Sequence, residues 1–275
     1  MSFNLINFWH QDARSNWLFK FIEFHKLNPK NRAINLYSVF GDRIDYNKPQ
    51  DAKKIFWTGE CMSYVGFPWA FEYGDHCLKD MDLCLGFMHS SESNYLRFPI
   101  WISGILSPNA TISDLRELVS KINDPKNRLS KRDKFAALIA SHSNLSDVRF
   151  DLFQSIKKLA KKLRIKSPYV HCAGRFLNNT DELNVKFNND KLSFLRQFKF
   201  NICPENCSSH GYVTEKIFHS FISGCIPIYW GALNDPEPDL INQESIIFYN
   251  KQDDIGLENS AKSLKRLNNR GGGGS

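Results

Sequence analysis

The sequence lacks several motifs by which common classes of protein are recognised. No glycine fingerprint of the G-x-G-x-x-G or P-loop kind occurs in its 275 residues, which disfavours classical dinucleotide and Walker sites. No stretch approaches the roughly 18 apolar residues that a spanning helix needs. Met1–Leu5 has neither the basic nor the apolar region of a signal peptide, so an exported or membrane-spanning protein is not expected.

A cysteine framework is also missing. The seven cysteines are scattered, no Cys-x-x-Cys pair occurs, and Cys203 and Cys207 are spaced for neither a zinc ribbon nor a redox motif. A reducing compartment is the simplest interpretation.

The composition is that of a folded, basic protein. Hydrophobic residues make up 42% of the chain, enough to form a core and to disfavour disorder. The net charge of +7 favours acidic partners, namely nucleotide phosphates, anionic lipid surfaces or nucleic acid. Part of the excess lies in the basic helix end at residues 157–166. A solvated helix face is favoured there, and contact with a membrane surface is the alternative.

Apolar runs alternate with helical patterns along the whole chain, which predicts an α/β fold with parallel sheets. The pattern predicts strands at residues 5–9, 34–40, 54–58, 83–87, 135–140, 169–172, 199–203, 226–230 and 246–249. It predicts helices at residues 16–26, 113–122, 149–163, 190–198 and 214–223. Residues 123–134 are polar, contain proline and lack apolar periodicity, so they are predicted to be a linker or long loop.

The most informative segment runs from Tyr212 to Gly231. Thr214 is a plausible N-cap for an amphipathic helix, and a buried strand that ends in glycine follows. Lys216 stands in the first turn of that helix, where the positive end of the helix dipole disfavours a cation. A lysine at this position is understandable when an anion such as a phosphate shares the site with the backbone N–H groups.

This segment resembles the signature of the bacterial-type α1,3-fucosyltransferase family. The preceding run Phe200-Asn201-Ile202-Cys203-Pro204-Glu205-Asn206 belongs to the same signature, so the match extends from about Phe198 to Gly231. The resemblance implies the GT-B architecture, in which two Rossmann-like lobes face each other across a cleft. The expected divisions are an acceptor-binding lobe at residues 1–122, the linker at 123–134, a GDP-fucose-binding lobe at 135–270 and an engineered Gly-Ser linker at 271–275.

A second patch with family character is Ile55-Phe56-Trp57-Thr58-Gly59-Glu60, a strand that ends in a Thr-Gly turn. Ligands of α/β proteins bind at this carboxyl edge of the strands. In the family the glutamate of the Thr-Gly-Glu step is taken as the catalytic base, and Glu60 matches it. A carboxylate there would take the proton from the acceptor hydroxyl. A solvated glutamate after a strand is the structural alternative.

The resemblance also assigns a donor site. Arg149, in a segment that resembles the pyrophosphate-contacting part of the family, and Lys216 would hold the diphosphate. Glu215 would contact sugar or ribose hydroxyls or face the charge that develops on the fucosyl ring, and it is counted among the catalytic candidates. Asn206 and Tyr212 would complete the donor pocket, and Trp69 is the candidate for stacking against an acceptor sugar.

No metal or cofactor is expected, because protein cations can neutralise the leaving diphosphate. Asp80-Met81-Asp82 spells the Asp-x-Asp of a different glycosyltransferase architecture but leads into a predicted strand, so a structural role is favoured. The isolated histidines form no ligand cluster.

The resemblance implies an inverting enzyme that moves L-fucose from GDP-fucose to the 3-OH of N-acetylglucosamine in N-acetyllactosamine-type acceptors, with a Lewis-x-type product. The choice between 3-OH and 4-OH stays open. The expected location is the bacterial cytoplasm, with peripheral association at the inner membrane as a variant, and the expected acceptors are precursors of surface glycans such as lipopolysaccharide. The rivals are a GT-B enzyme with another nucleotide sugar, a carbohydrate-binding module, and a basic nucleic-acid-binding protein, which no recognised motif supports.

Overall fold

The computed structural model describes residues 2–10, 12–28, 30–43, 51–62, 72–124, 132–143, 147–165 and 168–250. The chain divides into two compact units. Unit 1 comprises residues 1–112 and 209–215, and unit 2 comprises residues 113–208 and 216–275.

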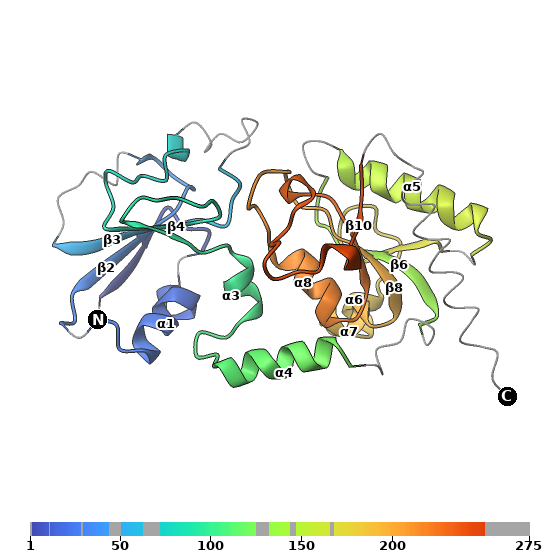
Figure 1. Cartoon of the computed structure of the whole chain (residues 1–275), viewed down its shortest axis with the longest axis horizontal. Helices are drawn as coiled ribbons and strands as arrows, with labels where there is room; N and C mark the ends of the chain where they lie inside the picture. Colours follow the sequence, from blue (N-terminus) through green and yellow to red (C-terminus); the bar gives the residue numbers. More distant parts are fainter. Residues whose placement is uncertain are drawn as a thin grey trace. The chain divides into compact units, whose positions relative to one another are not determined.

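Unit 1 is built on a parallel sheet whose described strands follow one another in chain order, β1-β2-β3-β4-β5 (Figure 1). The strands are β1 (Phe3–Ile6), β2 (Ala33–Tyr37), β3 (Ala52–Trp57), β4 (Leu83–Gly86) and β5 (Tyr95–Arg97). Its helical elements are η1 (Ala13–Ser15), α1 (Trp17–Phe24) and α3 (Trp101–Ile105). Helix α1 begins where it does because the side chain of Asn16 accepts hydrogen bonds from the N–H groups of Leu18 and Phe19.

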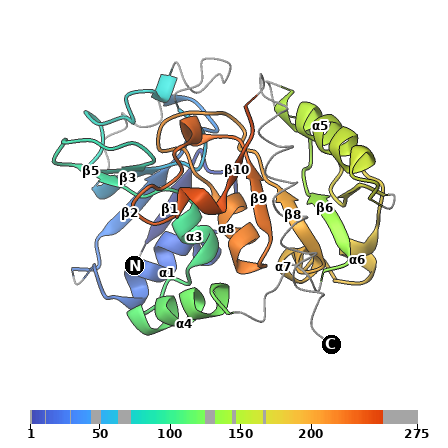
Figure 2. The ribbon, with the colours of Figure 1, turned by 45° about the vertical axis from the view of Figure 1, so that its right-hand side comes forward.

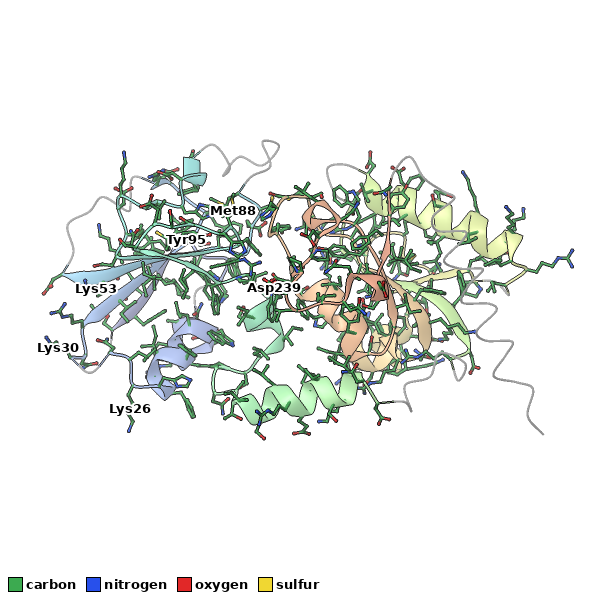
Figure 3. The ribbon with its side chains drawn as sticks, in the orientation of Figure 1. Lys26, Lys30, Lys53, Met88, Tyr95 and Asp239 are labelled. Atoms are coloured by element: carbon green, nitrogen blue, oxygen red, sulfur yellow. The ribbon has the colours of Figure 1, made fainter. Side chains whose placement is uncertain are left out.

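The core of unit 1 lies on both faces of this sheet. Leu36 of β2 is fully buried and packs in one apolar cluster, whereas its neighbours Tyr37 and Phe56 are fully buried in another. This alternation follows from the two-residue period of a strand. Lys26 and Lys30, in the connection from α1 to β2, point away from unit 1 into the surroundings (Figure 3).

Unit 2 has a parallel sheet of different topology. Its described strands lie in the order β10-β9-β8-β6-β7 (Figure 2). They are β6 (Lys134–Leu138), β7 (Val170–Cys172), β8 (Phe198–Ile202), β9 (Ile226–Tyr229) and β10 (Ile247–Phe248). The helical elements from here on are α4 (Ile112–Ile122), α5 (Val148–Lys162), α6 (Glu182–Val185), α7 (Lys191–Leu195), α8 (Glu215–Ile222), η4 (Ala232–Asn234) and η5 (Gln243–Ser245).

Helix α5 covers one face of this sheet with a single apolar stripe. Leu152, Ile156, Leu159 and Ala160 recur at helical spacing, are buried, and pack with the strands in one cluster. Its exposed face carries Lys157, Lys158, Lys161 and Lys162, so the basic run lies at the outer side of the helix.

The short segment 209–215 lies within unit 1 although it follows unit 2 residues in the chain. The ring of Tyr212 is buried against that of Phe87, with centroids 4.7 Å apart. Gly211 has φ +70°, and a Cβ at this position would lie 2.7 Å from the carbonyl oxygen of Phe87. Glycine is required there by both the backbone conformation and the close approach.

Each predicted strand and helix overlaps an observed one, and the α/β prediction is confirmed. The described elements named above that the pattern failed to predict are short: β5, α3, α6, η1, η4 and η5. The predicted first strand, residues 5–9, is displaced, because Asn7 adopts φ +54° and ends β1. The predicted helix 190–198 stops at Leu195, because Phe198 is fully buried and already pairs with Lys134 in the sheet.

The cysteines depart from the expectation of a reducing compartment, because disulfides are rare in such compartments. Cys77, Cys84, Cys172, Cys203 and Cys225 are free and buried, whereas Cys61 and Cys207 are disulfide-bonded. The predicted linker lies largely outside the described residues, and the predicted lobe limits stay a prediction.

Candidate functional site

The sheet of unit 2 contains a reversal of strand order. Strand β6 comes first in the chain, β7 pairs on one side of it, and β8 pairs on the other. At such a reversal the connections leave the sheet in opposite directions and open a crevice at the carboxyl ends of the two central strands. This topology predicts a ligand site beyond Leu138 and Ile202, the last residues of β6 and β8.

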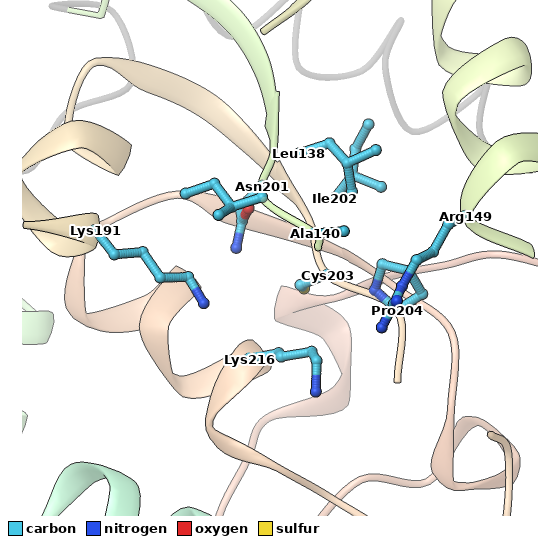
Figure 4. A pocket seen from close by; sticks show the side chains of 10 residues that line it. Leu138, Ala140, Arg149, Lys191, Asn201, Ile202, Cys203, Pro204 and Lys216 are labelled. Carbon is cyan, nitrogen blue, oxygen red and sulfur yellow. The ribbon is translucent and has the colours of Figure 1, made fainter. Parts of the chain in front are cut away.

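A pocket lies at that position (Figure 4). Its walls are the ends of β6 and β8 and three cationic side chains. The lining residues are Leu138, Ile139, Ala140, Asn201, Ile202, Cys203, Pro204, Arg149, Lys191 and Lys216. None of these lining residues is acidic, so the pocket wall is suited to an anion.

Arg149 is the second residue of α5, and its backbone and side chain are nearly buried. Its Nη1 donates to the carbonyl oxygen of His142 at 2.6 Å, and its Nη2 donates to Oδ1 of Asn206 at 2.7 Å. The structure therefore brings together two residues that the sequence placed in one donor site. Both of these acceptors are neutral, so these bonds orient the guanidinium without cancelling its charge.

Lys216 is the second residue of α8, and its amine has an acidic partner. The Nζ of Lys216 lies 3.1 Å from Oε2 of Glu205, which is fully buried. The hydroxyl of Tyr229 donates to Oε1 of the same carboxylate at 3.3 Å. Gly231 closes the other side, because a Cβ there would lie 2.7 Å from Cγ of Glu205.

Two further lining residues escaped prediction from the sequence. Lys191 is the first residue of α7, and Asn201 lies in β8, where its amide donates to Oγ of Ser220 at 2.9 Å. Lysine at a helix start is the same unusual signal that singled out Lys216. A polar residue inside an otherwise apolar strand is the signal for Asn201. Cys203 is a buried thiol that also lines the pocket, and burial raises its pKa to about 12, so it stays protonated at neutral pH.

Glu60 lies in unit 1, just beyond the end of the central strand β3. Its N–H donates to Oγ1 of the buried Thr58 at 3.1 Å, and the residue is partly exposed. The preceding Gly59 packs against the side chain of Ile100, since a Cβ added to Gly59 would lie 3.1 Å from that side chain. The Thr-Gly-Glu turn is thus held at the carboxyl edge of the sheet, the position that the sequence predicted.

The other predicted residues are distributed between the units. Tyr212 and Glu215 belong to unit 1, and Glu215 is the first residue of α8. Glu215 lies close to Gly104 of α3, because a Cβ added to Gly104 would be 3.0 Å from the Cβ of Glu215. Arg149, Asn206 and Lys216 belong to unit 2. Trp69 lies outside the described residues.

The Asp-x-Asp sequence is occupied by ion pairs. Asp80 lies 3.0 Å from Arg43, and Asp82 pairs with Lys53 and accepts the backbone N–H of Lys54. Within the described ranges no group of three or more His, Cys, Asp or Glu side chains is arranged to hold a metal ion. Of the helices that the structure describes, none combines the length and apolarity needed to cross a membrane.

The fold and the pocket define the class of protein, and comparison with protein families identifies the family. Parallel sheets with a cationic crevice at a reversal of strand order define an α/β protein of the kind that binds anionic ligands. The profile described as "Glycosyltransferase family 10 (fucosyltransferase) C-term" matches residues 129–270, just over half of the chain. The profile described as "Alpha-(1,3)-fucosyltransferase FucT N-terminal domain" matches residues 3–103. The chain belongs to glycosyltransferase family 10.

Curated relatives come from bacteria, animals and plants. The chain is 30% identical to "Alpha-(1,3)-fucosyltransferase FucT" of Helicobacter pylori over 212 residues, which is 66% of this chain and 38% of the relative. It is 40% identical to "Alpha-(1,3)-fucosyltransferase B" of Drosophila melanogaster over 101 residues, 34% of this chain and 22% of the relative. The matched part therefore spans well under half the length of these relatives.

Solved structures show the same fold. A crystal structure of an α1,3-fucosyltransferase aligns with a TM-score of 0.64 at 23% identity and covers 97% of this chain and 79% of its own. The corresponding structure with GDP-fucose aligns with a TM-score of 0.59 at 21% identity over the same shares. The predicted GT-B class of α/β fold is thereby confirmed.

Proposed function

We propose that this chain is an inverting α1,3-fucosyltransferase that uses GDP-fucose as its donor. The observation that carries the proposal is the pocket of unit 2, which is lined by three cations and no acid and lies at the reversal of strand order. A nucleoside diphosphate is an anion of the kind that such a pocket fits. Family membership and the likeness to a fold solved with GDP-fucose support the choice of donor.

In the proposed donor site, Arg149 and Lys216 bind the diphosphate. Arg149 has a planar guanidinium whose orientation is fixed by His142 and Asn206, so Asn206 acts by holding the arginine. Glu215 and Tyr212 are proposed to shape the sugar and ribose side of the site. Trp69 remains the candidate for acceptor stacking.

In the proposed reaction, the carboxylate of Glu60 takes the proton from the acceptor 3-OH as its oxygen attacks the anomeric carbon of fucose. A C–O bond forms to the acceptor oxygen while the bond from the anomeric carbon to the β-phosphate oxygen breaks. The electron pair leaves with GDP, and the configuration at the anomeric carbon inverts. Cations on the pocket wall stabilise the charge that grows on the β-phosphate.

The proposed acceptor is the N-acetylglucosamine of an N-acetyllactosamine unit on a surface glycan such as lipopolysaccharide, and the product is of the Lewis-x type. The name of the relative from Helicobacter pylori, an alpha-(1,3)-fucosyltransferase, supports the linkage to the 3-OH. The proposed location is the cytoplasm, with peripheral contact to the inner membrane. The exposed lysines of α5 support contact with an anionic membrane surface. Co-sedimentation with anionic vesicles, compared with neutral ones, tests the membrane contact.

The deciding experiment is transfer from GDP-fucose to N-acetyllactosamine, with and without EDTA, and with the linkage determined by NMR. An α1,3-linked product that is unaffected by EDTA supports donor, acceptor and independence from a metal together. GDP and UDP are then compared as competitors, since stronger inhibition by UDP would transfer the proposal to another nucleotide-sugar donor.

A further inference from the structure

Two aromatic residues of unit 1 lie at the same edge of the sheet as the proposed base. Strands β1, β2 and β3 lie side by side (Figure 2) and end at residues 6, 37 and 57. Trp9, Phe40 and Glu60 follow these three ends at the same short spacing. Because the strands are parallel and paired in register, all three residues belong to the carboxyl edge of the sheet.

Trp9 and Phe40 both present aromatic surface to the surroundings. Trp9 is 44% exposed and Phe40 is 42% exposed, whereas most large aromatic side chains of this unit are buried. The two rings meet edge to face, with their centroids 6.0 Å apart at an angle of 83°. A contiguous exposed apolar surface beside a proposed reacting group is typical of a ligand-binding surface.

The ring of Trp9 is held in place by buried neighbours. Phe8 is buried and stacks on it with centroids 4.3 Å apart, and the buried ring of Trp57 packs against it at 6.3 Å. The N–H of Phe40 donates to the carbonyl oxygen of Asn7 at 3.0 Å, which ties the residues after β2 to those after β1. The rings of Phe8, Trp9, Phe40 and Trp57, called the aromatic platform below, therefore lose little conformational entropy when a ligand binds.

A sugar ring is a ligand that such a surface fits. Galactose carries C–H groups on its less polar face, and these stack on the apolar face of an indole while the hydroxyl groups stay in water. Two strand spacings separate β1 from β3 by about 10 Å, which is close to the length of a disaccharide. An acceptor whose N-acetylglucosamine lies at Glu60 would therefore bring the galactose linked to it over Trp9.

We propose that the aromatic platform is a subsite for the second sugar of the acceptor, in which galactose stacks on Trp9. This inference rests on the proposed function, because it takes Glu60 as the group beside the reacting sugar. It assigns acceptor recognition to residues at the ends of β1 and β2, separate from Trp69.

The experiment compares kcat/KM for N-acetyllactosamine and for N-acetylglucosamine, at saturating GDP-fucose, in the full chain and in Trp9→Leu. Loss of the stacking contact is expected to lower kcat/KM for the disaccharide by about 5- to 30-fold. The value for the monosaccharide should stay unchanged, because it has no second sugar. GDP affinity, measured by isothermal titration, should also stay at the wild-type value.

Two further variants complete the design. Trp9→Phe keeps an aromatic ring and should retain most of the preference for the disaccharide. Phe24→Leu is the matched control, because Phe24 is 59% exposed at the end of α1 and lies outside the aromatic platform. It should use both acceptors as the wild type does. Melting temperatures of all variants show whether each one is folded.

An unchanged preference for the disaccharide in folded Trp9→Leu would overturn the inference. An equal loss for both acceptors would also overturn it, because the contact would then be to the reacting sugar. A wild-type chain that uses the two acceptors equally well would contradict a bound second sugar. Failure of the wild type to transfer fucose to either acceptor would instead count against the proposed function itself.

Discussion

The two sheets of this chain are alike in the number of strands that the structure describes and in their parallel direction, but they differ in strand order, and the cationic pocket described above lies at the sheet of unit 2. In unit 1 the strands follow one another in chain order, whereas in unit 2 the order reverses between β6 and β8. A reversal opens a crevice at the carboxyl edge, and a sheet without one has no equivalent place. Topology therefore separates the two units before any side chain is considered.

The use of arginine differs in the same way. In unit 1, Arg43 lies 2.8 Å from Asp75 and 3.0 Å from Asp80, so its charge is compensated within the protein. In unit 2, Arg149 lines the pocket, and its bonds to a carbonyl and an amide orient the guanidinium. The surroundings of the two arginines, an acidic cluster for Arg43 and a pocket wall for Arg149, thus separate a structural role from the proposed ligand-binding one.

The largest effect is expected for Glu60→Ala, which tests whether unit 1 supplies the base while unit 2 supplies the nucleotide pocket. If Glu60 is the base, kcat should fall by about 10²- to 10⁴-fold while GDP affinity stays unchanged, because the nucleotide pocket lies in unit 2. Steady-state kinetics together with GDP titration measure both quantities. Full activity would remove Glu60 from the mechanism, and lost GDP affinity would break the separation of roles.

Matched deletions in the two cores test the separation through stability. Leu36→Ala in unit 1 and Leu152→Ala in unit 2 each truncate a fully buried leucine and should each lower the free energy of unfolding by about 2–5 kcal/mol. Denaturant unfolding with and without GDP measures the effect. GDP affinity should survive in folded Leu36→Ala, because Leu36 lies in the core of unit 1 and the residues that line the diphosphate pocket belong to unit 2. Loss of GDP affinity would contradict this separation.

The comparison of arginines is tested by Arg149→Lys and Arg43→Lys. Lysine keeps the charge but loses the planar fork, so Arg149→Lys should weaken GDP binding by roughly 10-fold, consistent with about 1.5–3 kcal/mol for a charged hydrogen bond. Arg43→Lys should leave GDP affinity unchanged. Equal effects of both substitutions in GDP titrations would show that the different surroundings of Arg43 and Arg149 do not decide which of them binds the nucleotide.

The smallest effect concerns acid stability. Hydrogen bonds from Lys134 and Lys186 lower the pKa of Glu182 from 4.5 to about 2. Because the folded pKa lies below the unfolded one, this stabilisation is present above about pH 4.5 and is lost as the pH falls towards 2. Urea midpoints at pH 7, 4 and 3 should fall less steeply for Glu182→Gln than for the wild type, and parallel profiles would contradict the assignment.

The sequence predicted the elements well, because most strands are apolar runs and most helices are amphipathic. It failed where an element is too short to show a period, as in β5, a three-residue strand at the edge of its sheet, and in α6. It also failed where backbone conformation decides, as at Asn7, whose left-handed φ ends β1.

For the site, the family resemblance located Arg149, Asn206 and Lys216, and the structure places them in one unit. The partnership of Lys216 with Glu205 was not predictable, because it depends on a loop after β8 meeting the start of α8. Lys191 lies outside the recognised signature and reaches the pocket only through the packing of α7. Motifs thus identify residues close in sequence, whereas charge compensation arises between residues that only the fold brings together.

The position of segment 209–215 in unit 1 means that the backbone passes between the units three times, after residues 112, 208 and 215. A gene cut once in the middle would therefore yield neither unit intact. The N-terminal product would lack Tyr212, which fills the space beside Phe87, and the C-terminal product would carry that ring without its neighbour. Exchange of units among relatives of this chain should accordingly succeed only when segment 209–215 is taken from the same parent as residues 1–112.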